Sequence, residues 1–210
     1  MLRLIIYSAP AMLIACAPES DATSSADLSE DATTPADTFG YSDDAMVFDF
    51  GDGSEDGWFS VNDTVMGGVS SGSVTFGEES MLFEGEVSTS NNGGFASVRS
   101  PQEYFDFSSY SRVLIRLKSE GQPFSMIVAH NEWWFEDQFK YDIVVSGDDW
   151  NTIEIPFSDF QLTTVENGYP VMTDERMTPE DTSEVFHVEL MSKLFEDGDF
   201  RLEVDYIAFD

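Results

Sequence analysis

Short apolar runs separated by Gly, Asn, Asp and Ser are the feature that most constrains the fold of this chain after Met46. Such runs are typical of many short strands joined by tight turns, and not of helices. Within residues 112–118, Val113, Ile115 and Leu117 alternate with residues on the opposite face, as a half-buried strand requires. The sequence therefore predicts an all-β domain with strands at 46–50, 57–61, 72–76, 81–87, 95–99, 112–118, 124–130, 139–145, 152–155, 186–191 and 200–209.

The core of this domain has ample large apolar side chains, because 14% of the 210 residues are aromatic and 18 are Phe. About ten strands close most economically as a two-sheet sandwich or jelly roll. Only residues 158–160 and 179–184 favour helix, and both segments are short. We therefore expect one β-sandwich domain over residues 46–210.

The first fifteen residues, MLRLIIYSAPAMLIA, combine an early cation with an apolar run too short to span a bilayer. They predict a signal peptide. The run ends in Leu13, Ile14, Ala15 and Cys16, which resembles the bacterial lipobox. Cys16 is the only cysteine, so it forms no intrachain disulfide, and we expect it to carry the lipid.

Residues 16–45 are mostly Ala, Ser, Thr, Asp, Glu and Pro, a composition that buries too little apolar surface to fold. We expect a disordered acidic tether behind the lipidated cysteine. Ala17 stands where an Asp would be the inner-membrane retention signal. The expected location is the bacterial cell envelope, anchored in the outer membrane and facing the periplasm.

The charge balance excludes several partners, since Lys and Arg number 9 against 41 Asp and Glu, a net charge of −32. Nucleic acid would be repelled, because affinity for it comes largely from Lys and Arg that neutralise phosphates. Contact with anionic lipid is expected only through the anchor. The charge is explained by a solvated surface that keeps the protein soluble. The alternative is binding of a divalent cation such as calcium, for which the sequence places no cluster of oxygen ligands.

No catalytic residues are predicted. The two histidines, His130 and His187, stand far apart in sequence, and no Cys or His pair has metal-ligand spacing. The chain also lacks a nucleophile elbow and a phosphate loop. We expect a protein that is not an enzyme and that has no cofactor.

The most distinctive segments are WFSVNDTVMGGVSSG at 58–72, FEGEVSTSNNGGFASVR at 83–99, IEIPFSDF at 153–160 and the closing FRLEVDYIAFD. Together they resemble the complex I intermediate-associated protein 30 family, in the expected order over about residues 47–210. The resemblance implies a galactose-binding-like jelly roll. It also implies a role as an assembly factor for respiratory complex I, but an exported lipoprotein would lie across the inner membrane from the side where mitochondrial members act. The resemblance brings no catalytic residues.

The two glycine-containing motifs have two interpretations. The glycines are required where a backbone turns with positive φ or approaches another strand closely. Alternatively, amide, carboxylate and guanidinium groups of the motifs converge on one face and bind a polar ligand or a partner. The candidate binding residues are Asn62, Asp63, Met66, Gly67, Gly68, Asn91, Asn92, Gly93, Gly94, Phe95, Arg99, Trp133 and Trp134.

Arg99 is expected to pair with an acid such as Asp63, either as a structural ion pair or as a ligand contact. Of the adjacent Trp133 and Trp134, one is expected in the core and the other is a candidate platform for a sugar ring or for a protein partner. Trp58 and Trp150 are expected to be packing residues.

Two functions remain open from the sequence. The leading hypothesis is a scaffold or assembly factor that binds a protein partner through the rim carrying the glycine motifs. The alternative is a carbohydrate-binding module of the cell envelope, which needs an exposed tryptophan beside polar groups in a groove.

Overall fold

The computed structural model describes residues 40–210, except 52, 54–56, 134, 146 and 193–194. The predicted signal peptide, Cys16 and most of the predicted tether lie outside the described residues. Thirteen strands and three 3-10 turns make up the described part, and none of its helices is long and apolar enough to cross a membrane.

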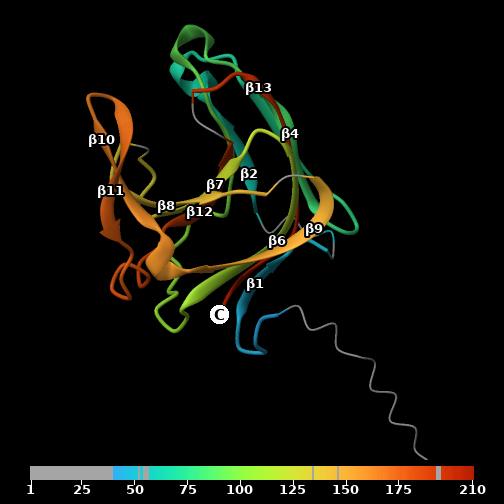
Figure 1. The fold of residues 1–210 in the computed structure, drawn as a ribbon, viewed down its shortest axis with the longest axis vertical. Helices are drawn as coiled ribbons and strands as arrows, with labels where there is room; N and C mark the ends of the chain where they lie inside the picture. The colour runs from blue at the N-terminus through green and yellow to red at the C-terminus, as the bar shows by residue number, and fades with distance from the viewer. Residues whose placement is uncertain (1–39, 52, 54–56, 134, 146, 193–194) are drawn as a thin grey trace, which may run out of the picture. The chain divides into compact units, whose positions relative to one another are not determined.

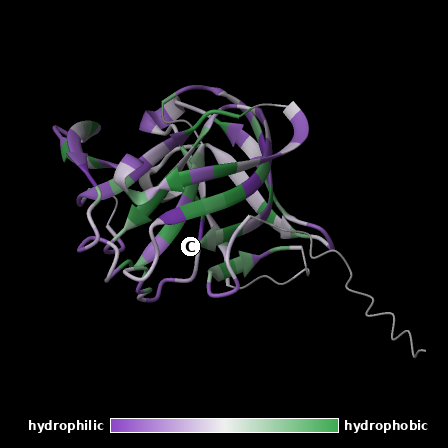
Figure 2. Ribbon diagram, turned by 60° about the horizontal axis from the view of Figure 1, so that its bottom comes forward, coloured by the Kyte–Doolittle hydropathy of each residue, from purple (hydrophilic) through white to green (hydrophobic). Residues whose placement is uncertain are grey.

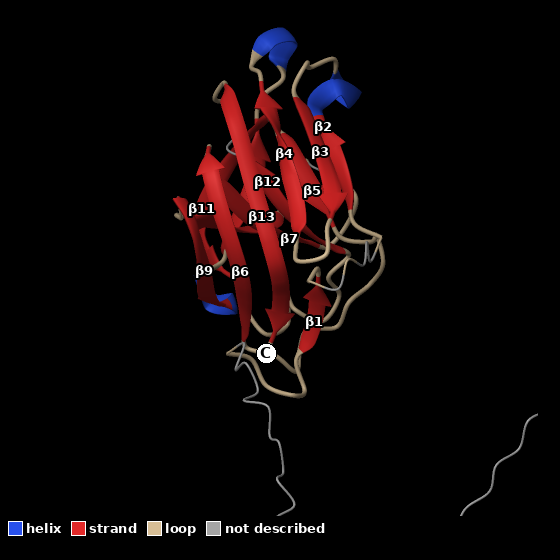
Figure 3. Ribbon diagram, turned by 90° about the vertical axis from the view of Figure 1, so that its right-hand side faces the viewer, coloured by secondary structure: helices blue, strands red, loops and turns tan. Residues whose placement is uncertain are grey.

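One antiparallel sheet has six strands in the order β3-β4-β13-β6-β9, with β1 paired to β13 (Figure 3). The long strands β13 and β6 form its centre, with Ile207 opposite Ile115. Its strands are β1 (Met46–Asp49), β3 (Ser71–Phe76), β4 (Met81–Val87), β6 (Arg112–Gly121), β9 (Gly147–Pro156) and β13 (Gly198–Phe209).

The second antiparallel sheet has seven strands in the order β11-β10-β8-β7-β12-β5-β2. Figure 1 shows β7, β8 and β12 crossing the middle of the view, with the β10–β11 hairpin standing at the left. The strands are β2 (Phe59–Asn62), β5 (Ala96–Arg99), β7 (Phe124–Ala129), β8 (Gln138–Ile143), β10 (Gln161–Glu166), β11 (Tyr169–Arg176) and β12 (His187–Ser192).

The core lies between the two sheets and is rich in phenylalanine. The ring of Phe83 lies 4.8 Å from that of Phe200, and Phe107 stacks on Phe209 at 3.8 Å between centroids. Trp58 is buried against Phe48, as expected for a packing residue. Figure 2 shows hydrophobic stretches on the strands, where they alternate with hydrophilic bands, and further hydrophilic residues on the turns.

The predicted strands are confirmed with shifts of a few residues at their ends, but two strands were missed. No strand was predicted between residues 156 and 186, where β10 and β11 form a hairpin around Asn167 and Gly168. Residues 157–159 form the 3-10 turn η3, close to the segment expected to form one helical turn. Residues 179–184 form turns, so the helical interpretation of that segment is wrong.

Candidate functional site

The carboxylate of Asp63 is the centre of the first glycine motif. Asp63 begins the 3-10 turn η1 (Asp63–Met66) directly after β2, and it is 1% exposed. Its Oδ1 accepts a hydrogen bond from the backbone N–H of Ser70 at 3.0 Å, and its Oδ2 accepts one from the Ser70 hydroxyl at 2.5 Å. One side chain therefore closes the loop between β2 and β3.

The same carboxylate holds the second glycine motif. Oδ2 of Asp63 accepts hydrogen bonds from the backbone N–H groups of Gly94, at 2.6 Å, and Phe95, at 3.3 Å. Figure 3 shows the resulting proximity of the two 3-10 turns, η1 and η2 (Ser90–Asn92), at one end of the domain. The two motifs are neighbours in space because β2 pairs with β5 and β3 pairs with β4, and the Asp63 carboxylate also binds backbone N–H groups of both loops.

Asp63 is fully engaged by these contacts. Burial would raise its pKa, but the hydrogen bonds from Ser70, Gly94 and Phe95 outweigh burial and hold the pKa below its ordinary value. Because its acceptors already bind protein donors and its side chain is buried, Asp63 is not exposed to an external ligand.

The close approach around Asp63 explains two of the glycines. A Cβ at Gly68 or at Gly93 would overlap the Asp63 carboxylate. Both positions therefore need glycine for steric reasons, which is the first of the two interpretations given by the sequence. Gly67, at φ 89°, ends η1 in the left-handed region, which favours glycine.

The other polar residues of the motifs do not converge with Asp63. Asn62 turns its amide to the backbone oxygen of Gly72, at 3.0 Å. Asn91 and Asn92 are exposed at η2 and take positive φ angles of 59° and 62°. Met66 lies in η1. The motif residues therefore form a tightly hydrogen-bonded loop cluster with two exposed asparagines, and not one polar face.

Arg99 pairs with an acid, as expected, but the acid is Glu189 and not Asp63. Its Nε lies 3.2 Å from Oε2 of Glu189, its direct neighbour across β5 and β12. His187 lies on the same strand, with Nε2 3.6 Å from the same oxygen. Burial would raise the pKa of Glu189, but the charge of Arg99 and the contact with His187 lower it to about 2.

Trp133 is exposed in the loop between β7 and β8, where its ring stacks on that of Phe135 at 5.7 Å. Trp134 lies outside the described residues. Trp150 is half-buried under the cationic groups of Arg116 and Lys118 on the outer face of the six-stranded sheet. Trp133 is therefore the exposed member of the pair among the described residues, and its role as a platform stays a prediction.

A groove of about 510 Å³ opens on the seven-stranded sheet. Its floor comes from β7, β8 and β10, where Ser125, Lys140, Asp142 and Thr163 face the same side of the sheet. Figure 1 shows how the β10–β11 hairpin rises at one end of this sheet. The sequence did not predict this groove, because it depends on the missed hairpin.

The floor of the groove is polar. The hydroxyl of Ser125 donates to Oδ1 of Asp142 at 2.7 Å, and Nζ of Lys140 lies 3.4 Å from the same oxygen. The Thr163 hydroxyl oxygen is buried, and it has no hydrogen-bond partner among the described residues. Lys140 and Asp142 therefore offer a cation and a carboxylate to a ligand, while the hydroxyls of Ser125 and Thr163 are buried beneath them.

Two aromatic rings stand above this floor. Tyr169, the first residue of β11, is 64% exposed, and Phe195, from the loop between β12 and β13, is 49% exposed. Their ring centroids are 5.9 Å apart. The groove therefore combines aromatic faces with hydrogen-bonding groups, the usual make-up of a small-molecule site.

A sequence signal for this hairpin existed. Asn167 and Gly168 separate two runs of strand-forming residues, and an Asn-Gly pair in that setting is a strong hairpin signal. The structure gives both residues positive φ, 54° and 84°, as a type I′ turn requires.

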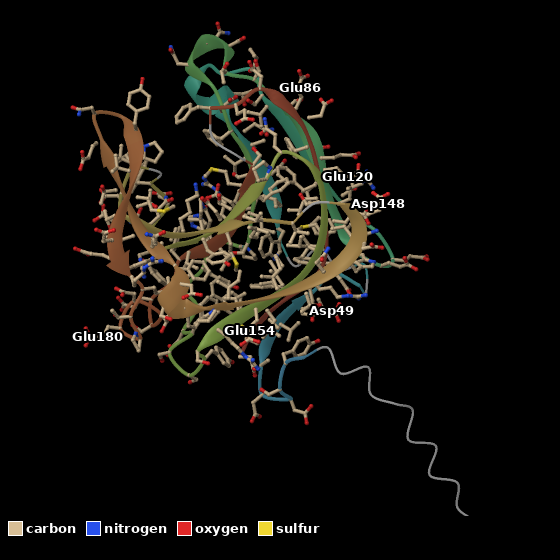
Figure 4. The ribbon with its side chains drawn as sticks, in the orientation of Figure 1. Asp49, Glu86, Glu120, Asp148, Glu154 and Glu180 are labelled. Carbon is tan, nitrogen blue, oxygen red and sulfur yellow. The ribbon has the colours of Figure 1, made fainter. Side chains whose placement is uncertain are left out.

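A second hollow of about 280 Å³ lies on the outer face of the six-stranded sheet and is lined by charged residues. Lys118 pairs there with Glu203 at 2.8 Å, and Arg201 with Glu84 at 2.6 Å. Figure 4 labels Glu120 and Asp148, whose contact raises the pKa of Glu120. Within the described part of the chain, no three His, Cys, Asp or Glu side chains are placed to hold a metal ion.

Comparison with known proteins connects the chain to one family. A model of the family Complex I intermediate-associated protein 30 (CIA30) matches residues 48–204. A protein of Caenorhabditis elegans described as "Probable complex I intermediate-associated protein 30, mitochondrial" is 31% identical over 105 residues, 48% of this chain and 29% of the relative. The protein of the same description from Caenorhabditis briggsae is 30% identical over 105 residues, again 48% of this chain and 29% of the relative. The match spans less than a third of the length of these relatives.

Several solved structures have a similar fold, among them carbohydrate-binding modules and a part of an agarase. The family 11 carbohydrate-binding module of the Clostridium thermocellum cellulase Lic26A-Cel5E has a TM-score of 0.53 at 18% identity, covering 79% of this chain and 94% of that one. The module in complex with a β-1,3-1,4-mixed-linked tetrasaccharide gives 0.52 at 17% identity, covering 79% and 95%. The agarase AgWH50C gives 0.54 at 12% identity, covering 79% of this chain and 24% of the agarase. At these identities the likeness concerns the fold alone, and it confirms the predicted jelly-roll class.

Proposed function

This chain belongs to the complex I intermediate-associated protein 30 family, and on that premise we propose that it is a non-catalytic binding module that holds a glycan chain in the groove on its seven-stranded sheet. The observation that carries the proposal is the groove itself, with Tyr169 and Phe195 above a floor of Ser125, Lys140 and Asp142.

The chemistry of the groove suits a sugar chain. The C–H faces of a pyranose are apolar and pack on aromatic rings, while its hydroxyls need donors and acceptors within reach. Tyr169 and Phe195 provide the rings, and Asp142 and Lys140 provide the polar partners, with Asp142 held by the buried Ser125 hydroxyl. The cation of Lys140 already has Asp142 beside it, so the floor favours a neutral chain over an anionic one. The charge of −32 favours the same choice.

The fold supports this proposal by analogy. A family 11 module of the same fold is described in complex with a mixed-linked tetrasaccharide. Fold similarity alone does not transfer a ligand, so the argument depends on the groove residues of this chain.

A protein partner is the second candidate, and one observation favours it. Val144 is 89% exposed and Met172 is 40% exposed, and both line the groove, so its rim has apolar surface of the kind that protein interfaces cover. The names of the curated relatives suggest an assembly role. A lipid anchor at Cys16 would place this chain in the envelope, where a glycan is accessible and the peripheral arm of complex I is not.

The test is titration of the full-length protein with neutral oligosaccharides, including a mixed-linked β-glucan, and with soluble cell-wall glycan fragments, followed by calorimetry. Tyr169→Ala should weaken binding about tenfold or more, because it removes a stacking ring. The matched control is Tyr104→Ala, since Tyr104 is 72% exposed and does not line the groove. Trp133→Ala tests the other exposed platform.

Two results would overturn the glycan proposal. The first is no binding of any neutral glycan in the set. The second is binding that Tyr169→Ala leaves unchanged and Trp133→Ala abolishes, which would move the site to the loop between β7 and β8. Crosslinking in intact cells that recovers respiratory-chain subunits, and loses them with Val144→Asp, would favour the protein partner instead.

A further inference from the structure

We propose that Asp63 is a positioning residue for the groove. It acts through the backbone of Gly94, which holds Phe195 in place as one wall of the groove, so the two glycine motifs support the groove without lining it. This inference depends on the proposed function for its consequence on binding. Its structural part concerns the place of one ring and can be measured without any ligand.

The backbone of Phe195 is unusual. Its φ is 58°, in the left-handed region that residues with a bulky side chain rarely occupy. Such a conformation persists only where neighbouring groups hold it. The N–H of Phe195 donates to the carbonyl oxygen of Gly94 at 2.8 Å, which supplies one such restraint.

Gly94 connects Phe195 to the buried carboxylate. Its own N–H donates to Oδ2 of Asp63 at 2.6 Å, while its carbonyl accepts from Phe195. A Cβ at Gly94 would lie 3.0 Å from the N, Cα and Cδ1 atoms of Phe195, and the φ of Gly94 is 140°. Only glycine therefore lets the second motif approach the aromatic residue this closely.

The two residues after Phe195 are also held, each by a different segment. The side chain amide of Gln122, which is 6% exposed, donates to the carbonyl oxygen of Glu196. The backbone N–H of Thr89 donates to Oδ1 of Asp197 at 2.5 Å, and its hydroxyl lies 3.1 Å from that oxygen. Three successive loop residues are therefore fixed from three places.

These contacts give the glycine motifs a role in ligand binding although they do not touch the ligand. Asp63 and Gly94 do not line the groove, but Phe195 does. A ring held in place before binding spares the ligand the entropy cost of ordering it. The motifs therefore contribute to affinity through preorganisation and not through contact.

The first test places 4-fluorophenylalanine at position 195 of the full-length protein and records its ¹⁹F spectrum. Gly94→Ala should shift or broaden the resonance, because the new Cβ displaces the residue. Gly57→Ala is the matched control: its φ is 73° and its Cβ would lie 3.0 Å from Pro101, which does not line the groove. Thr89→Val, which removes one hydroxyl contact to Asp197, is the milder second variant.

The second test is a double-mutant cycle on affinity for the oligosaccharide that binds best. Gly94→Ala should weaken binding about tenfold in the wild-type background and have little effect in a Phe195→Ala background. An unchanged ¹⁹F resonance in both Gly94→Ala and Thr89→Val overturns the positioning role even if glycan binds. If Gly94→Ala weakens binding equally in the wild-type and Phe195→Ala backgrounds, the positioning of Phe195 does not contribute to affinity. A shifted resonance in a protein that binds no glycan refutes the proposed function and leaves the positioning role supported.

Discussion

The guanidinium of Arg99 and the carboxylate of Glu189 face each other across β5 and β12, 3.2 Å apart, with side chains only 11% and 2% exposed. In a protein with 41 acids and 9 Lys and Arg, this pair is far better shielded from water than the surface pairs of β6. Removing one partner from a buried pair leaves an uncompensated charge, which costs far more than losing the attraction of an exposed pair.

Glu189→Gln should therefore lower the free energy of unfolding by about 3–5 kcal/mol, because Arg99 stays buried without its counter-charge. Urea unfolding followed by tryptophan fluorescence measures the change. Glu154→Gln is the control, since Glu154 is 55% exposed and pairs with Arg112, and it should change stability by about 0.5 kcal/mol at most. Equal effects of the two substitutions would contradict this assignment.

Acid should weaken the fold through the same carboxylate. The pKa of Glu189 is lowered to about 2 in the folded protein, from an ordinary value of 4.5. A depressed folded pKa gives stability that is fully present above the unfolded pKa and is lost as pH falls from about 5 towards 2. The Glu189→Gln variant should show a shallower loss over this range. If the difference in unfolding free energy between the wild type and Glu189→Gln is the same at every pH from 6 to 3, this linkage is refuted.

Asp63→Asn tests the carboxylate that joins the motifs. An amide in its place turns one acceptor into a donor, which then faces backbone N–H groups of Ser70, Gly94 or Phe95. We expect a loss of about 2–4 kcal/mol in stability, because charge-assisted bonds are lost and buried donors are left unpaired. Thermal unfolding measures it. Asp106→Asn, at an exposed Asp that also accepts from a backbone N–H, should have little effect. A stable Asp63→Asn protein would show that other contacts hold the motifs.

The sequence predicted the sandwich because alternation in strands such as β6 and the short Gly-separated runs are local properties. One of its two interpretations brought the motifs of Asp63 and Gly94 together on one face, but it did not predict that the carboxylate turns inward, because Asn and Asp serve both in turns and in binding sites. The partner of Arg99 depends on strand pairing between residues 90 positions apart, which composition does not encode. The groove was not predicted because the β10–β11 hairpin that carries Tyr169 was not predicted, although the Asn167–Gly168 pair indicates a hairpin.

That hairpin gives the last prediction. Gly168 takes φ 84° in the two-residue turn, where a β-branched side chain is strained, and Tyr169 follows it directly. Gly168→Val should therefore fray β10 and β11, which form one end of the seven-stranded sheet, while the remaining strands stay paired. Hydrogen exchange should lose protection within residues 161–176 and keep it in β7 and β12. Glycan affinity should fall about as far as in Tyr169→Ala, because the ring loses its fixed place.

Gly147→Val, at φ 115° with nothing within 4 Å of its Cβ, is the matched control and should leave affinity unchanged. Full protection of the hairpin together with lost binding would mean that the turn contributes by contact and not by holding Tyr169 in position.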